Sequence, residues 1–132
     1  MHKTIIILLL LVASSSAVAE WVKVGSNKTV TIYAHPTTIR KTTVNKVKMW
    51  SLYDYNAAQE PTSSRPYMSM KFQDEYNCKE EQSRILYSIT HSENMGGGRS
   101  LYSRKHDMIW TSISPGSIFH NLWKFACGQR YP

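Results

Sequence analysis

The sequence predicts an α+β domain: a single antiparallel sheet of about six strands with a C-terminal α-helix tethered by a disulfide. Three observations predict this class. Short runs in which apolar and polar residues alternate recur from residue 21 to residue 113, and a period of two is typical of strands. Apolar residues take helical spacing only near the end, between Ile118 and Ala126. One cysteine, Cys78, closes a strand-like segment, and the other, Cys127, closes the helical one.

Residues 1–19 are predicted to be a cleaved signal peptide, which leaves residues 20–132 as one small domain. The segment has a basic start at Lys3, an apolar run over residues 5–12, and the small-residue triplet Ala17-Val18-Ala19 that signal peptidase accepts. The apolar run is too short for the roughly 20 residues that a membrane-spanning helix needs. An uncleaved anchor helix is the alternative. No cysteine lies near the cleavage site to accept a lipid anchor.

The first half of the domain is predicted to hold three strands. Residues 21–24 and 29–34 are rich in β-branched side chains and flank a turn-forming Gly25-Ser26-Asn27. A polar stretch separates them from a third extended segment over residues 44–53. That segment carries apolar residues at odd and even positions, which predicts either a bulge or a strand buried on both faces. Residues 56–66, with two prolines, are predicted to form a loop.

The clearest strand pattern covers residues 68–78. Its apolar positions alternate with polar ones and are Met68, Met70, Phe72, Tyr76 and Cys78. One face of this strand is therefore predicted to be core, packed against apolar residues of the helix. Asp74 interrupts the apolar set. Because burial of an unpaired carboxylate is costly, we expect Asp74 near a strand end, a bulge or a hydrogen-bonding partner.

Three further strand-like segments follow. Residues 85–91 alternate again after the charged turn at residues 79–82, which predicts a hairpin. Residues 94–98, with three consecutive glycines, supply the next reversal. Residues 101–102 and 108–113 are predicted to be two more short strands.

The helix is predicted to begin at Ser114 as its N-cap, with Pro115 at the first helical position, and to end at Gly128. Its last turn then contains Cys127. Because export exposes thiols to oxidation, we expect Cys127 to pair with Cys78. Two free buried thiols are the alternative.

The chain is basic, with a net charge of +7. Basic residues are dense in the first predicted strands, and six of them form the candidate basic binding face: Lys23, Lys28, Arg40, Lys41, Lys46 and Lys48. Such a face attracts polyanions such as heparan-type glycans over a long range. The alternative is a solvated sheet face on which edge lysines prevent aggregation.

The sequence predicts no catalytic, cofactor-binding or metal-binding residues. No two histidines have the H-x-x-x-H spacing of a zinc site, and no G-x-S-x-G nucleophile motif occurs. The acidic pairs at residues 74–75 and 80–81, together with His91 or His106, are the material that a small secreted ribonuclease would need. Solvated turn charges explain the same residues, and we prefer that interpretation.

Several short motifs occur in a fixed order along residues 20–132. They are Trp21, Val47-Lys48-Met49-Trp50-Ser51-Leu52, Tyr76-Asn77-Cys78-Lys79, Ser92-Glu93-Asn94-Met95-Gly96, Trp110, and Ser114-Pro115-Gly116-Ser117 before Cys127. In this order and spacing they resemble the bacterial surface-adhesin protein E-like family. The resemblance implies a sheet of about six antiparallel strands with a disulfide-tied C-terminal helix. It marks Trp50, Trp110, Pro115 and Gly116 as structural residues. The members that give the family its name are adhesins that bind host extracellular-matrix proteins and plasminogen.

We therefore expect an exported, non-enzymatic binding protein of a Gram-negative bacterium, located in the periplasm or on the outer cell surface. Its expected partners are host matrix proteins, plasminogen or polyanionic glycans, and no nucleic acid. A periplasmic protein-binding or inhibitor module of the cell envelope is the first alternative. A small secreted hydrolase that acts on nucleic acid is the second.

A homodimer is also expected. The rings of Trp21, Tyr33, Trp50 and Tyr53 cannot all lie under one short helix. The uncovered sheet face or an edge strand is therefore predicted to pair with a second copy. The alternative places these rings in the core of the monomer.

Overall fold

The computed structural model describes residues 20–62 and 65–128. They form one antiparallel sheet in which strands β1 to β6 lie side by side in sequence order, and β7 pairs with β5 outside this path. The strands are β1 (Val22–Ser26), β2 (Val30–Thr43), β3 (Lys46–Gln59), β4 (Tyr67–Asn77), β5 (Gln82–His91), β6 (Ser100–Lys105) and β7 (Thr111–Ser112). The helices are the 3-10 helix η1 (Asn94–Gly96) and the α-helix α1 (Ile118–Cys127). The predicted fold class is confirmed. The predicted signal peptide lies outside the described residues.

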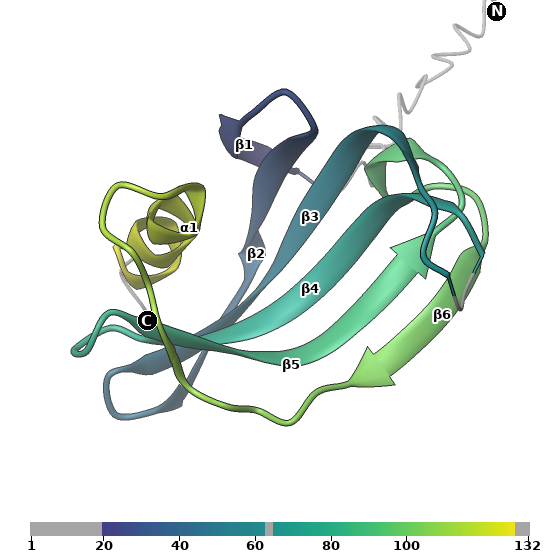
Figure 1. Ribbon diagram of the computed structural model, residues 1–132. Coiled ribbons are helices and arrows are strands. Elements are labelled where there is room, and N and C mark those ends of the chain that lie inside the picture. The colour runs from purple at the N-terminus through teal and green to yellow at the C-terminus, as the bar shows by residue number, and fades with distance from the viewer. Residues whose placement is uncertain (1–19, 63–64, 129–132) are drawn as a thin grey trace, which may run out of the picture.

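The two faces of the sheet are covered by different elements (Figure 1). Helix α1 packs over β1, β2 and β3 on one face, which we call the helix face and which carries Met49 and Tyr76. The opposite face, which we call the open face, carries Tyr33 and Trp50. On the open face η1 lies against β3 and β4 and covers Leu52, which is fully buried.

The core lies between α1 and the helix face of β2, β3 and β4. Alternate residues of these strands are buried there because the side chains of a strand point to opposite faces in turn. They meet the apolar stripe of the helix. The buried members are Val30, Ile32, Ala34, Val47, Met49, Tyr76, Leu122 and Ala126.

Strands β2 and β3 are longer than their sequence pattern predicts. Strand β2 continues through the mostly polar residues 37–43, and the chain then reverses at Asn45, which has a left-handed φ of 60°. Strand β3 continues to Gln59, so the predicted loop is wrong over residues 56–59. Hydrogen bonds of the sheet join backbone groups and need no apolar side chain, which is why polar stretches extend this hairpin.

Strand β3 is buried on both faces, which is one of the two possibilities that its apolar pattern allowed. Met49 lies in the core on the helix face, and Leu52 lies under η1 on the open face. In β4, Tyr76 is buried in the core, whereas Met68 and Met70 are only partly buried. The helix therefore meets the predicted core face of β4 at its Tyr76 end.

Helix α1 begins later than the sequence predicts. Its N-cap is Ser117, whose hydroxyl oxygen accepts a hydrogen bond from the backbone N–H of His120. Ser114 and Pro115 lie in the preceding turn, where Gly116 has a φ of 79°. A left-handed residue cannot continue a right-handed helix, so the predicted start at Ser114 is wrong. The helix ends at Gly128 as predicted.

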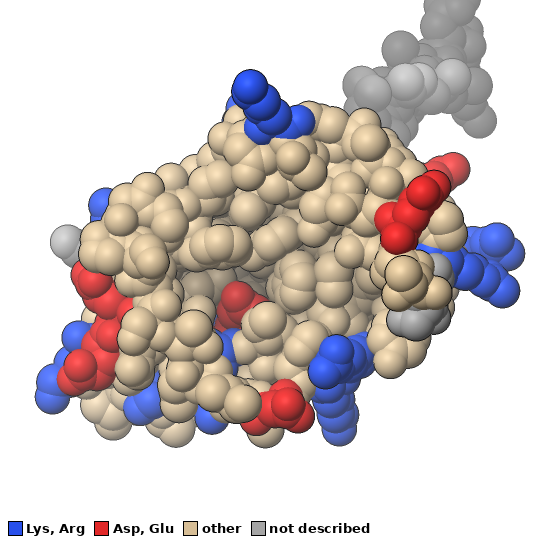
Figure 2. Space-filling view, in the orientation of Figure 1, with Lys and Arg blue, Asp and Glu red and all other residues tan. Residues whose placement is uncertain are grey.

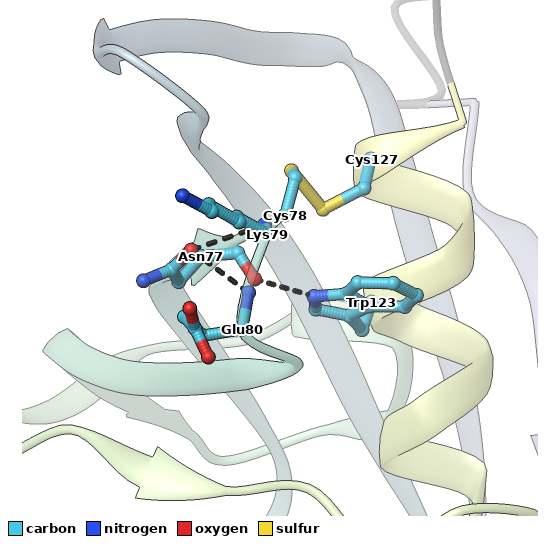
Figure 3. Close-up of a disulfide and its surroundings, with 6 residues drawn as sticks. All are labelled: Asn77, Cys78, Lys79, Glu80, Trp123 and Cys127. Carbon is cyan, nitrogen blue, oxygen red and sulfur yellow. Dashed lines mark hydrogen bonds between the residues drawn. A yellow bond between two sulfur atoms is a disulfide. The ribbon is translucent and has the colours of Figure 1, made fainter.

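The predicted disulfide is present (Figure 3). Cys78, directly after β4, is bonded to Cys127 in the last turn of α1, with a Cα–Cα distance of 5.5 Å. Beside it, the indole N–H of Trp123 donates a hydrogen bond of 2.8 Å to the carbonyl oxygen of Asn77. The side chain of Asn77 accepts hydrogen bonds from two backbone N–H groups of the turn that follows. A covalent bond and a hydrogen bond thus join α1 to the end of β4.

The predicted strand at residues 108–113 is reduced to β7, which pairs with Gln82 and Ser83 of β5. Met108 has a left-handed φ of 56°, and this conformation interrupts an extended segment. The residues between β6 and β7 therefore leave the sheet and run past its helix face on the way to α1 (Figure 1).

Candidate functional site

A hollow of about 350 Å³ opens on the helix face (Figure 2). It lies between α1, strands β3 to β5, and the segment of residues 106–111 that follows β6. The residues that line it include Tyr53, Asp74, Ile85, Met108, Ile109 and Phe119. Its volume falls within the range of roughly 300–1,000 Å³ that is usual for ligand pockets. The hollow is therefore large enough to receive a side chain or a small molecule.

The walls of this hollow are apolar and partly exposed. The residues Ile85, Met108, Ile109 and Phe119 are 36%, 49%, 69% and 52% exposed. The ring of Phe119 lies 6.2 Å from the ring of Tyr53, so α1 contacts the sheet at this edge of the hollow. Exposed apolar side chains gathered around a concavity are typical of interaction sites.

The floor of the hollow carries the carboxyl group of Asp74 on β4. Asp74 is 8% exposed, and its Oδ1 atom has no hydrogen-bond partner among the described residues. Burial raises the pKa of Asp74 from 3.8 to about 7, because loss of water disfavours the charged form. The residue sits at a register shift between β4 and β5, and a bulge is one of the three settings in which the sequence places it. Acidic atoms are visible at the bottom of the hollow in Figure 2.

Two phenol groups belong to the same face of the sheet as this carboxyl group. Burial, and then the charge of Asp74, raise the pKa values of Tyr53 and Tyr76 well above 10.0. Both phenols therefore stay protonated at neutral pH. The hydroxyl of Tyr76 is also buried without a hydrogen-bond partner among the described residues. Buried polar groups normally have partners. Tyr76 does not line the hollow, so the unpartnered group that a ligand in the hollow can reach is the Asp74 carboxyl.

The basic groups around the hollow already have partners. The Nε of Arg84 donates a hydrogen bond of 2.7 Å to Glu75, and its guanidinium group lies 4.5 Å from the ring centre of Trp110. His106 shares a hydrogen bond of 2.7 Å with the hydroxyl of Ser88. Burial, and then a nearby arginine, lower the pKa of His106 below 6.5, so this ring is neutral at pH 7. The charge that the hollow offers to a ligand is therefore acidic.

Three of the six predicted basic residues lie together. Arg40 of β2 pairs with Lys48 of β3 on the open face, and Lys46 follows on the same face beside the β2–β3 turn. We call Arg40, Lys46 and Lys48 the hairpin basic group. Among the described residues no ion pair engages these three side chains.

The other three predicted basic residues are spread over the sheet. Lys41 pairs with Val47 and so lies on the helix face. Lys23 lies on β1, and Lys28 lies in the turn between β1 and β2. The predicted face is thus divided, because alternate residues of a strand point to opposite sides.

The residues that a ribonuclease would need are separated. His91 pairs with Ser69 on the open face and is buried, whereas His106 lies at the hollow on the helix face. Glu80 and Glu81 lie in the turn between β4 and β5. In residues 20–62 and 65–128, no group of three or more His, Cys, Asp or Glu residues is placed to hold a metal ion.

Comparison with known proteins decides the family. A family model described as surface-adhesin protein E matches residues 21–128. The chain belongs to the surface-adhesin protein E family. Among curated proteins, none matches the sequence significantly.

Solved structures of Haemophilus influenzae protein E share the fold of this family member. One has a TM-score of 0.65 at 15% identity and covers 82% of this chain and 83% of its own. A second crystal form has a TM-score of 0.66 at 15% identity, with 82% and 87% covered. Protein E from non-typeable Haemophilus influenzae has a TM-score of 0.63 at 16% identity, with 82% and 75% covered.

Membership of the surface-adhesin protein E family makes this chain a non-enzymatic adhesin, as the sequence predicts. The family implies an exported, surface-associated protein. No helix within the described residues is long and apolar enough to cross a membrane.

The residues marked as structural by the family motifs lie at contacts between elements. The ring of Trp50 meets that of Tyr87 edge to face at 6.1 Å on the open face. Trp110 lies under the guanidinium group of Arg84. Pro115 and Gly116 form the turn before α1, and nothing lies within 4 Å of a Cβ built on Gly116. Gly116 is thus required by its backbone conformation and not by crowding.

Sequence reasoning misses the hollow of this adhesin. The broken alternation at Asp74 is the one signal of it in the sequence. The apolar pattern of residues 108–113 predicts a strand and conceals the left-handed residue Met108, which turns this segment into a wall of the hollow.

Proposed function

We propose that this adhesin binds host extracellular-matrix proteins at the outer surface of a Gram-negative bacterium. The observation that carries the proposal is the family match over residues 21–128. A fold shared with Haemophilus influenzae protein E over 82% of the chain supports it. Plasminogen and heparan-type glycans are further proposed ligands.

The hairpin basic group is the proposed contact for acidic ligands. Arg40 is exposed, Lys46 and Lys48 are partly exposed, and no ion pair within the described residues neutralises them. A net charge of +7 attracts acidic partners from a distance, and lysine and arginine side chains that form no ion pair then hold them at close range. Because dissolved salt screens such attraction within about 10 Å at 0.1 M, binding should weaken as salt rises.

Binding of the purified protein to immobilised matrix proteins, plasminogen and heparin tests the proposal. The triple variant Arg40→Gln, Lys46→Gln, Lys48→Gln should bind more weakly and show less dependence on salt. The matched control is Lys28→Gln, Lys79→Gln, Lys105→Gln, which removes the same charge elsewhere and should bind nearly as well as the wild type. No binding to any of these ligands would contradict the adhesin function, and equal losses in both variants would contradict the hairpin basic group as the contact.

Location separates this proposal from a periplasmic protein-binding or inhibitor module. Protease added to intact cells should remove a surface adhesin, whereas a periplasmic protein should be cleaved only after the outer membrane is opened. A protein that is spared on intact cells would favour the periplasmic alternative.

A further inference from the structure

We propose that the hollow on the helix face binds the side chain of a lysine from a protein partner, with the Asp74 carboxylate facing the ammonium group. The proposal deepens the adhesin function by naming the partner chemistry at one site. It rests on the proposed function only in taking the partner to be a protein.

The walls of the hollow suit the aliphatic part of a lysine side chain. They are formed by Ile85, Met108, Ile109 and Phe119, all of which are partly exposed in the free protein. Lysine buries its methylene chain along apolar surface of this kind while its charged end reaches a polar site. Covering these side chains would also remove exposed apolar area from water.

The floor of the hollow suits the ammonium group. Asp74 is 8% exposed and its Oδ1 atom lacks a hydrogen-bond partner among the described residues. An ammonium group brings three N–H donors and a positive charge, which are what a buried carboxylate lacks. Tyr53 lines the same hollow, and its phenol oxygen is a further hydrogen-bond acceptor.

Other ligand classes fit the hollow less well. An anion would be brought beside the Asp74 carboxylate, and a purely apolar side chain would leave that carboxylate buried without a partner. The two basic residues that line the hollow do not compete for it, since Arg84 is engaged by Glu75 and His106 is neutral at pH 7. Asp107 is exposed and lines the hollow as well, so it adds to the attraction for a cation.

The affinity of this site for an ammonium group should depend on pH, because binding requires Asp74 to lose its proton. Asp74 titrates near pH 7 in the free protein, and a bound ammonium group favours its ionised form. Affinity should therefore fall by up to about tenfold for each pH unit below 7 and stay nearly constant above it. Tyr53 from β3 and Tyr76 from β4 lie close enough for the charge of Asp74 to raise their pKa values, and Arg84 from β5, His106 and Asp107 line the same hollow. Among these, protonation of His106 in acid would repel the ligand and so change affinity in the same direction.

The experiment uses a matched pair of probes, Nα-acetyl-lysine N-methylamide and Nα-acetyl-norleucine N-methylamide, which differ by the ammonium group. Backbone amide signals of the labelled exported protein are followed by NMR during titration with each probe at pH 5 to 8. The lysine probe should shift signals of the hollow and bind about tenfold or more tightly than the norleucine probe, as expected for a charged hydrogen bond.

Two protein variants assign the effect to one carboxyl group. Asp74→Asn keeps the size of the side chain and should lose the preference for the lysine probe together with the pH dependence. Glu60→Gln, at an exposed position that does not line the hollow, should keep both. Equal binding of the two probes to the wild type would overturn the proposal without need of any variant, as would a lysine preference that survives in a folded Asp74→Asn.

The lysine probe and the matrix proteins together separate this proposal from the adhesin function. If the lysine probe binds in the hollow but no matrix protein binds the wild type, the site stands and the adhesin function fails. If matrix proteins bind while the lysine probe does not, the adhesin function stands and the lysine site fails.

Discussion

At the scale of single residues, Asp74 couples the stability of the fold to pH. Its pKa is about 7 in the folded chain, against an ordinary value of 3.8, so the folded chain holds this proton more tightly than the unfolded chain does. The contribution to stability is therefore fully present below pH 4. It is lost as pH rises from about 4 to about 7, at roughly 1.4 kcal/mol per pH unit. A protein that keeps such an acid gives up stability at neutral pH, as functional sites commonly do.

The variant Asp74→Asn should remove this pH dependence. The amide is neutral at every pH and nearly the same size, so the variant should resemble the wild type at pH 4 and exceed its free energy of unfolding by up to about 4 kcal/mol at pH 8. Urea unfolding at a series of pH values measures the difference.

Asp107→Asn is the control for this measurement, because Asp107 is exposed and its replacement should change stability little at any pH. A difference between Asp74→Asn and the wild type that stays constant from pH 4 to pH 8 would contradict the prediction.

At the scale of elements, helix α1 depends on its attachment to the sheet. It has 10 residues, and helices of this length are marginal in water on their own. Leu122 and Ala126 bury one stripe of it against the strands, and the disulfide joins its last turn to the end of β4. Because the bridged cysteines are 49 residues apart, the chain-entropy model gives a stabilisation of about 4 kcal/mol. The position of α1 also fixes the Phe119 wall of the hollow.

Cys127→Ala should lower the free energy of unfolding by about 2–5 kcal/mol, because the unfolded chain is no longer held in a loop. Denaturant unfolding of the oxidised protein measures the loss, and reduction of the wild type should produce a similar one.

Trp123→Phe provides the comparison for the bridge, since it removes the hydrogen bond to the Asn77 carbonyl, keeps an aromatic ring beside His120, and should cost about 1 kcal/mol. If Cys127→Ala costs no more than Trp123→Phe, the disulfide is not the main attachment of the helix.

At the scale of the whole molecule, the open face is where a second copy is expected. Trp50 packs against Tyr87 there, and Tyr33 lies on the same face of β2. The ring of Trp21 packs at the same face, 4.7 Å from that of a histidine on β2. Tyr53 lies on the helix face instead, beside Phe119 of α1, so the four rings do not all lie under the helix, as the sequence predicts. Strand parity explains this result, because Trp50 and Tyr53 are an odd number of residues apart.

The protein should form a weak or moderate homodimer through its open face or an edge strand, because partly exposed aromatic rings contribute strongly to interfaces. Sedimentation across a hundredfold range of concentration should show a mass that rises from monomer to dimer. Trp50→Ala should shift the equilibrium towards monomer.

Phe119→Ala is the matched control for the dimer, since it removes an exposed ring from the helix face and should leave association unchanged. A monomer mass that does not change with concentration would refute the dimer and leave the open face free in solution.

The sequence by itself determined the class of elements, their order and the disulfide. Alternation of apolar residues at 68–78 and helical spacing at 118–126 are local consequences of how each element buries one face, so they can be read without the fold. The two cysteines needed only an oxidising location to be paired. These features required no knowledge of which strand lies beside which.

Only the tertiary structure decided which side chains meet. The register of β2 and β3 places Lys41 on the helix face and Arg40 with Lys48 on the open face. Of the six basic residues that the sequence groups together, only the three of the hairpin basic group therefore lie side by side. The left-handed backbone at Met108 turns an apolar segment away from the sheet, and this segment then forms a wall of the hollow above Asp74. The sequence showed Asp74 only as an interruption of the apolar pattern and not as the floor of a hollow. Such sites depend on the relative placement of distant segments, and a periodic pattern within one segment holds no information about that placement.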